Sequence, residues 1–261
     1  MKHKWNWLLI GIILLIFPIV NAKAQIADKK ELTFNYAKEL KIETLSGKVN
    51  VKKSTDSKVH LTLQWDYVPQ SNFRPKINEE DGVIILKEVF EGSTYKGGSI
   101  WMLQVPDGIN LDVFATSGSV ELNNVYGTFK IQTTTGNINA TEVAFKNESI
   151  FTTSMGKIKI KLSEKLTKNI TVRSITGEAI LDFNHNDFDG KIVMTARKNR
   201  GKIESFLETK KTEIIMKDAN HLDSMDDVQR EKEFVRQTFL SVNNTPEIYI
   251  ETEVGLAKII K

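Results

Sequence analysis

The side chains best suited to chemistry gather in one short run, Asp182-Phe-Asn-His185-Asn-Asp187-Phe-Asp189-Gly190. Its carboxylates and amides offer the oxygen ligands that a hard cation such as Ca²⁺ prefers. The run matches neither an EF-hand loop nor the nonapeptide of calcium-binding repeat proteins. Asn, Asp and Gly are also the residues that a long turn between strands requires. We therefore interpret Asp182–Gly190 as a turn and expect no metal ligand there, with cation binding as the alternative.

Residues that could perform catalysis are sparse elsewhere. The chain has no Cys and four His, one of them His3. His60 falls on the polar phase of an expected strand, which predicts a solvent-facing side chain. His221 stands beside Asp223, Asp226 and Asp227 in a segment that we interpret as a solvated acidic loop.

A basic group near one end of the repeats could belong to a polysaccharide-cleaving cleft. Such a cleft needs paired carboxylates, or Lys and Arg combined with Asp. The basic residues have no carboxylate at a recognisable spacing; they are Arg173, Arg197, Lys198, Arg200 and Lys202. The sequence therefore predicts no enzyme, no catalytic residue and no cofactor.

Two tryptophans could act as flat platforms for stacking sugars. Trp101 lies between Ile100 and Met102 in a mostly apolar run, which favours packing in the core or in a cap. We apply the same interpretation to Trp65.

A recurring glycine organises the elements that would position these residues. It stands at positions 118, 136, 156, 177 and 201, in steps of 18, 20, 21 and 24 residues. Each glycine separates two runs of alternating apolar and polar residues, as in 129–133 and 137–140 around Gly136. Such alternation buries one face of a strand and leaves the other in water. Glycine suits a corner because it adopts positive φ without a clash, and a preceding Ser or Thr can bond nearby backbone.

Repeats of nearly fixed length mark a repeat architecture. One strand–corner–strand unit cannot enclose its own apolar face, whereas stacked units share a continuous interior. We therefore predict an all-β fold, a parallel β-solenoid in which strands of successive coils pair in parallel about 4.8 Å apart. The glycine corners should then form a column.

Residues 1–24 have the pattern of a secretory signal peptide. A basic start at 1–4 precedes an apolar run over 8–20 and a small-x-small site at Ala22-Lys-Ala24. The apolar run is shorter than the ~20 residues of a membrane-spanning helix. We expect cleavage after Ala24 and no integral membrane domain in the mature chain. Export would place the protein in the periplasm, on the outer-membrane surface or outside the cell.

The net charge of +3 belongs to this leader. It holds Lys2, Lys4 and Lys23 and no acidic residue, so the 36 basic residues fall to 33, equal to the 33 acidic ones. A neutral mature chain has no long-range field to attract nucleic acid, and we expect no nucleic-acid partner. The lack of Cys also excludes disulfides and a cysteine-linked lipid anchor.

The segments that flank the regular repeats are less periodic. Residues 25–110 are expected to form an irregular β region that caps the stack, although 40–51 carries the repeat's Ser-Gly-x-Val signature. Residues 111–261 are expected to hold the solenoid repeats, with one continuous domain over 37–261 as the alternative.

The end of the chain is expected to return to strands. Residues 212–216 and 234–242 predict strands with a polar loop between them, and 245–261 predict a closing two-strand unit around Gly255.

The array resembles a known family. Units of the form S/T-x-G-x-[IV]-x-[AILV], ending in a Pro246-x-Ile-x-Ile-x-Thr-x-x-Gly255-x-x-x-Ile pattern, are similar to the bacterial putative adhesin domain family. Its members are exported β-helix-like proteins common in Bacteroidetes. The resemblance spans about Leu40 to Lys261 and departs from the family pattern at Val254-Gly255-Leu256, where Asn-Gly-Asp is usual. It implies an adhesin with no catalytic residues to carry over.

These features together predict a non-enzymatic, exported cell-envelope protein. It would act as an adhesin or surface scaffold whose strand faces bind an unidentified surface glycan or protein. One alternative is a periplasmic β-helix protein that binds or cleaves carbohydrate. The other is an accessory protein in envelope stress or signalling.

Overall fold

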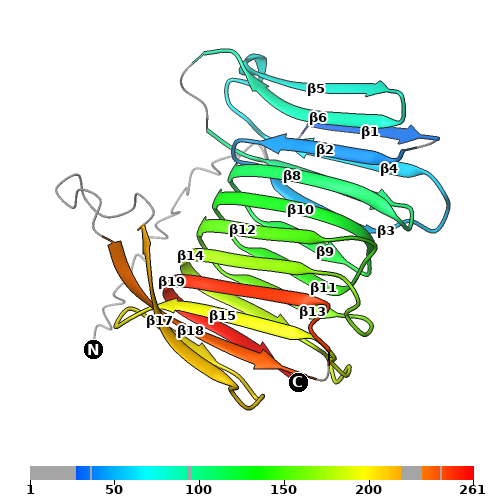
Figure 1. Ribbon diagram of the computed structural model, residues 1–261. Helices are drawn as coiled ribbons and strands as arrows, with labels where there is room; N and C mark the ends of the chain where they lie inside the picture. Colours follow the sequence, from blue (N-terminus) through cyan, green and yellow to red (C-terminus); the bar gives the residue numbers. More distant parts are fainter. Residues whose placement is uncertain (1–27, 36, 93–95, 219–230, 242) are drawn as a thin grey trace, which may run out of the picture.

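The computed structural model describes residues 28–35, 37–92, 96–218, 231–241 and 243–261 (Figure 1). The expected signal peptide and the segment around His221 lie outside these residues. The described chain is all-β apart from one 3-10 turn, η1 at Gln70–Asn72. None of its described helices could span a membrane.

The strands form two walls that meet along the glycine corners. In stacking order, wall 1 contains β5 (Phe73–Glu80), β6 (Val83–Phe90), β2 (Glu39–Thr44), β8 (Ile109–Ser117), β10 (Tyr126–Thr135), β12 (Ser149–Met155), the first halves of β14 (Ile170–Asp182) and β19 (Glu247–Ile260), β15 (Lys191–Arg197), β18 (Glu231–Leu240) and β17 (Lys211–Asp218). In the same direction, wall 2 contains β1 (Asp28–Phe34), β4 (Val59–Trp65), β7 (Ser99–Val105), β3 (Lys48–Lys53), β9 (Val120–Asn123), β11 (Ile138–Phe145), β13 (Ile158–Leu162), the second halves of β14 and β19, and β16 (Gly201–Glu204).

Successive coils pair in parallel throughout the middle of the stack. Parallel pairing runs from β6 to β15 in wall 1 and from β7 to β16 in wall 2. This confirms the expected parallel β-solenoid. Antiparallel strands finish the walls, with β5, β4 and β1 at one end and β18 and β17 at the other (Figure 1).

The stacking order departs from the chain order at both ends. β2 and β3 lie between β6/β7 and β8/β9, and β19 lies between β14 and β15/β16. The expectation that the unit around Gly255 closes the stack is therefore wrong, because β15 and β16 lie outside it. The β2–β3 unit and β19 each lie one layer inside an end of the parallel stack. Each therefore has a neighbouring strand on both sides, so its backbone groups are paired on both edges. The boundary expected near residue 110 stays a prediction.

The glycine corners form the expected column except at Gly201, where a Cβ would meet Ala196 and the Glu253 carbonyl instead of another glycine. In stacking order the column contains Gly47, Gly118, Gly136, Gly156, Gly177 and Gly255, and a Cβ on each of the last five would overlap the carbonyl oxygen of the one before. Gly156, Gly177 and Gly255 also have positive φ. The corners thus approach more closely than any side chain allows.

Buried hydroxyls satisfy the carbonyl groups of this column. Thr133 and Thr153 both donate to the Gly136 carbonyl, at 3.0 and 3.1 Å. Ser174 donates to Gly156 at 2.8 Å and Thr252 to Gly177 at 3.0 Å. The expectation that Ser and Thr before a glycine fix the corner is confirmed.

The core lies between the walls. The inward residues of each strand are almost fully buried, such as Leu111 and Val113 in wall 1 and Val120 and Leu122 in wall 2. The core is continuous along the stack, because one apolar cluster extends from Phe34 to Ile259. Packing in this core holds the strands in place, and the outer faces of these strands are in contact with solvent.

Candidate functional site

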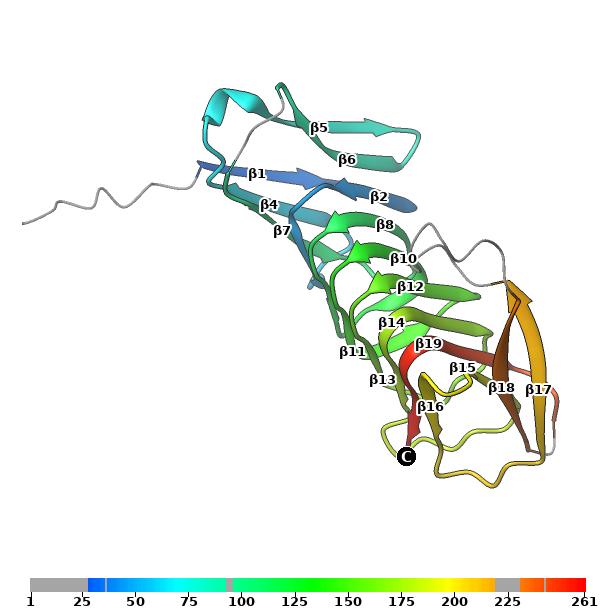
Figure 2. The same ribbon diagram turned by 90° about the vertical axis from the view of Figure 1, so that its left-hand side faces the viewer.

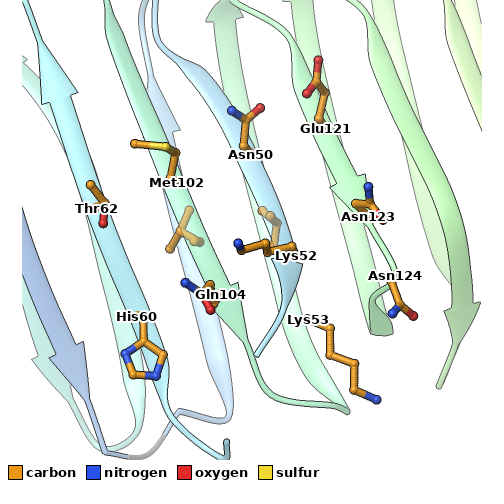
Figure 3. A pocket seen from close by; sticks show the side chains of 12 residues that line it. Asn50, Lys52, Lys53, His60, Thr62, Met102, Gln104, Glu121, Asn123 and Asn124 are labelled. Carbon is orange, nitrogen blue, oxygen red and sulfur yellow. The ribbon is translucent and has the colours of Figure 1, made fainter. Parts of the chain in front are cut away.

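An open groove of about 600 Å³ lies on the outer face of wall 2, over β4, β7, β3 and β9 (Figure 3). The strand registers set its side chains in two rows. The first row is Thr62, Met102, Asn50 and Glu121, and the second is His60, Gln104, Lys52 and Asn123. Lys53 and Asn124 also line the groove.

The rows stand on a rigid base. The residues that alternate with them point inward, and Leu61, Leu103, Val51 and Leu122 are each at most 2% exposed. Successive side chains of a strand point to opposite faces, so packing of these four residues also positions their polar neighbours.

Most charges around the groove are already paired. Glu121 lies 2.8 Å from Lys48 Nζ, Lys53 Nζ lies 2.6 Å from Asp107, and His60 Nε2 lies 3.0 Å from Asp56. Lys52 is exposed and has no ion-pair partner in the described part of the chain. Among the described residues that line the groove, Lys52 thus presents an ammonium group without an ion-pair partner.

Both ring nitrogens of His60 have partners. Nε2 contacts Asp56, and Nδ1 lies 3.2 Å from the Thr33 hydroxyl. The backbone N–H of Lys58, the Ser54 hydroxyl and His60 hold the pKa of Asp56 at about 2. His60 lies on the outer face with its side chain 33% exposed, in line with the expected solvent-facing phase. Contacts on both sides therefore fix the orientation of its ring.

One acceptor in the groove lacks a donor. The amide oxygen Oδ1 of Asn50 is buried and has no hydrogen-bond partner among the described residues. A second hollow of about 410 Å³ adjoins the groove, sharing Lys53 and Asn124, and Glu142 and Glu164 are among its lining residues.

A buried carboxylate, Glu88, fixes the wall corner near the groove. Its Oε2 accepts the backbone N–H groups of Leu45 and Ser46 at 2.7 and 3.2 Å. Its Oε1 accepts from Trp101 Nε1 at 3.2 Å and from the hydroxyl of Ser99. Because these donors occupy both of its oxygens, the Glu88 carboxylate has a structural role and is not a ligand-binding group.

Two members of the basic group, Arg173 and Lys198, lie beside carboxylates that no sequence spacing indicated. Arg173 Nε lies 3.1 Å from Glu251 Oε1, and its Nη2 lies 3.7 Å from Glu253 Oε1. Lys198 Nζ lies 2.6 Å from Glu233. These acids belong to β18 and β19, which meet β14 and β15 only through the out-of-order stacking.

A charged cluster of Lys217, Tyr249 and Glu251 links strands at the end of wall 1. Glu251, 2% exposed, contacts Lys217 Nζ and the Tyr249 hydroxyl, and these two groups lie 2.6 Å apart. Burial raises the pKa of the Glu251 carboxyl, but hydrogen bonds from Lys217 and Tyr249 outweigh it and hold the pKa below its ordinary value. β15 and β18 separate β17 from β19 in the wall, so this contact requires the wall to curl at its end (Figure 2).

Asp182–Gly190 forms the expected connection between strands. Asp182 accepts the N–H of Asn184 at 2.8 Å, and Asp189 accepts the Nδ2 of Asn243 at 2.6 Å. Asn184 and His185 adopt positive φ, as turn residues do. No group of three metal-ligating side chains occurs within the described residues. The oxygen atoms of this segment serve the turn.

The tryptophans lie in the core region rather than on a binding face. Trp101 is fully buried, and Trp65 packs against the core with its ring 5.5 Å from that of Phe73. Apart from His60, the groove residues were not singled out in the sequence, although their polar phase was visible. Only the register between strands brings Asn50, Lys52 and Gln104 together.

Comparison with known proteins agrees with the repeat pattern. Residues 109–212 match the family model described as Toastrack DUF4097, in line with the resemblance of the repeats to the putative adhesin domain family. No curated protein sequence matches the chain.

Several solved structures are similar to the chain. One is a putative cell adhesion protein from Clostridium sporogenes, at 15% identity and a TM-score of 0.42, covering 89% of this chain and 98% of that one. A second is a putative adhesin from Bacteroides fragilis, at 10% identity and a TM-score of 0.43, covering 89% and 97%. A third is a putative lipid binding protein from Parabacteroides distasonis, at 10% identity and a TM-score of 0.33, covering 90% and 97%.

Proposed function

We propose that the protein is a non-enzymatic binding protein of the cell envelope. It would act as an adhesin or surface scaffold that holds a surface glycan or protein against wall 2. The observation that carries this proposal is the groove, where amide, hydroxyl and ammonium groups stand in two rows on rigid strands. Amide side chains both donate and accept hydrogen bonds, which suits a ligand rich in polar groups.

The lining favours binding over cleavage. Glycoside hydrolysis uses two carboxyl groups on either side of the scissile bond. Among the described residues that line the groove, Glu121 is the one carboxylate, and Lys48 is ion-paired with it. Carbohydrate binding is therefore favoured over carbohydrate cleavage in this groove.

Export is part of the proposal and rests on the leader at residues 1–24. The pattern of a basic start, an apolar run and a small-x-small site supports it. Fractionation of the tagged protein in its native cell tests this part. Recovery of the protein in the cytoplasm with its leader uncleaved would contradict export.

A bulky residue in the groove tests the binding face. Asn123 is exposed in the groove, and Asn139 is exposed on the same wall outside it. We expect Asn123→Trp to abolish binding of the exported protein to a glycan array or to immobilised envelope fractions, and Asn139→Trp to preserve it. Equal binding by wild type and Asn123→Trp would refute the binding face, and release of reducing ends from any bound polysaccharide would refute the non-enzymatic assignment.

A further inference from the structure

We infer that the groove recognises an acidic sugar unit, a hydroxyl-rich monoanion of the uronic acid class, through the ammonium group of Lys52. This inference deepens the proposed function and rests on it.

The charge balance of the groove points to an anion. Gln104 and Asn123 flank Lys52 in its row, about 4.8 Å away on the neighbouring strands, and Asn50 lies about 6.6 Å along the same strand. All three neighbours are neutral amides. Glu121 and Asp107 are ion-paired with Lys48 and Lys53, and Asp56 accepts hydrogen bonds from the Ser54 hydroxyl and the Lys58 N–H beside His60, two strands away from Lys52. Lys52 is therefore left to pair with one carboxylate of a ligand.

The amides around Lys52 point to hydroxyl groups on the same ligand. The side-chain amides of Gln104 and Asn123 line the groove on either side of Lys52. A sugar hydroxyl can donate to an amide oxygen and accept from an amide N–H at the same time, whereas a carboxylate can only accept. A ligand that satisfies both Lys52 and these amides carries a carboxylate and hydroxyls together.

A peptide fits this groove less well. β7 and β3 are paired along both edges, so a peptide strand finds no free backbone groups to pair with. Of the eight residues in the two rows, Met102 alone is apolar, so no pocket receives an aromatic anchor.

The ligand segment that binds should be short. Beyond Lys53 and Asn124 the adjoining hollow is lined by Glu142 and Glu164, which would repel the continuation of a polyanion. Recognition is therefore of one acidic unit or a few, rather than of a long charged chain.

Titration calorimetry with tri-galacturonic acid and its methyl ester tests the inference, because the ester keeps the hydroxyls and loses the charge. We expect wild type to bind the acid about tenfold more tightly than the ester, as for the loss of one charge-assisted hydrogen bond. Lys52→Gln should remove this preference. Lys159→Gln should retain it, since Lys159 is an exposed lysine on the same wall outside the groove. Longer oligogalacturonates should bind no more tightly per chain than the trimer.

The outcomes separate this inference from the proposed function. Equal affinity for acid and ester, or a preference that survives in Lys52→Gln, overturns the acidic-sugar inference. If Asn123→Trp at the same time abolishes binding of a neutral glycan, the binding face itself stands. If tri-galacturonic acid binds Asn123→Trp as tightly as wild type, it binds elsewhere and the inference is overturned. An affinity that rises steadily with oligomer length would overturn recognition of a short segment.

Discussion

Gly255 lies directly against Gly177, so that a Cβ on Gly255 would overlap the Gly177 carbonyl oxygen. The two residues are partners in the register of β19 and β14. The unit at the end of the chain thus takes the position in the column that chain order would assign to Gly201. It fits there because Thr252 supplies the hydroxyl that satisfies the Gly177 carbonyl.

The corner glycines should tolerate no side chain. We expect Gly136→Val and Gly177→Val each to lower the free energy of unfolding by about 1–3 kcal/mol. At Gly136 the reason is overlap with the Gly118 carbonyl, and at Gly177 it is overlap together with a φ of 139°. Urea denaturation measures the effect, and Gly98→Ala serves as control because a Cβ there meets no atom within 4 Å. Corner variants as stable as this control would refute the close stacking.

Replacing the Glu88 carboxylate with an amide should destabilise the protein. Both oxygens accept from donors, so Glu88→Gln would turn an NH₂ group toward either the N–H of Leu45 or the indole N–H of Trp101. We expect a loss of about 2–3 kcal/mol in denaturant unfolding, as for a buried charged acceptor that is lost. Glu79→Gln on exposed β5 should change stability little. Similar stability of the two variants would contradict the structural role of Glu88.

The Lys217–Glu251 pair should stabilise the curled end of wall 1. We expect Lys217→Met to cost about 1–3 kcal/mol, less than the ~3–5 kcal/mol of a fully buried pair, because the Lys217 side chain is 28% exposed. Thermal or urea unfolding measures it. Lys159→Met removes an exposed lysine from the other wall and should have little effect. A Lys217→Met protein as stable as wild type would show that the pair contributes nothing.

The same pair should make stability fall in acid. The folded-state pKa of Glu251 lies below its ordinary 4.5, so its contribution is complete above that pH and is lost as the pH falls through the lowered pKa. Glu251→Gln should therefore flatten the stability profile below about pH 4.5. An unchanged acid slope in this variant would contradict the lowered pKa.

Calcium should not stabilise the protein through Asp182–Gly190. The carboxylates of Asp182 and Asp189 accept hydrogen bonds from Asn184 and Asn243, so they are committed to the turn. We expect the same melting temperature with added CaCl₂ and with EDTA. A rise with calcium that disappears in Asp187→Asn would restore the cation-binding alternative, since ligand binding to the folded state raises stability.

The local pattern of the chain was enough to predict strands and corners, because both depend on neighbouring residues. Alternation around Gly136 sets which side chains face inward, and once coils stack, the close approach of successive corners demands glycine. The parallel solenoid follows, since a single unit leaves its apolar face uncovered.

Only the tertiary structure decided which units are neighbours. Backbone pairing is the same for any coil of similar shape, so nothing local in 247–260 specifies a place between β14 and β15. For the same reason Arg173 and Glu251 could not be paired from the sequence, nor could Lys52 be placed between Gln104 and Asn123. The groove arises from register between distant strands, and register is a property of the assembled stack.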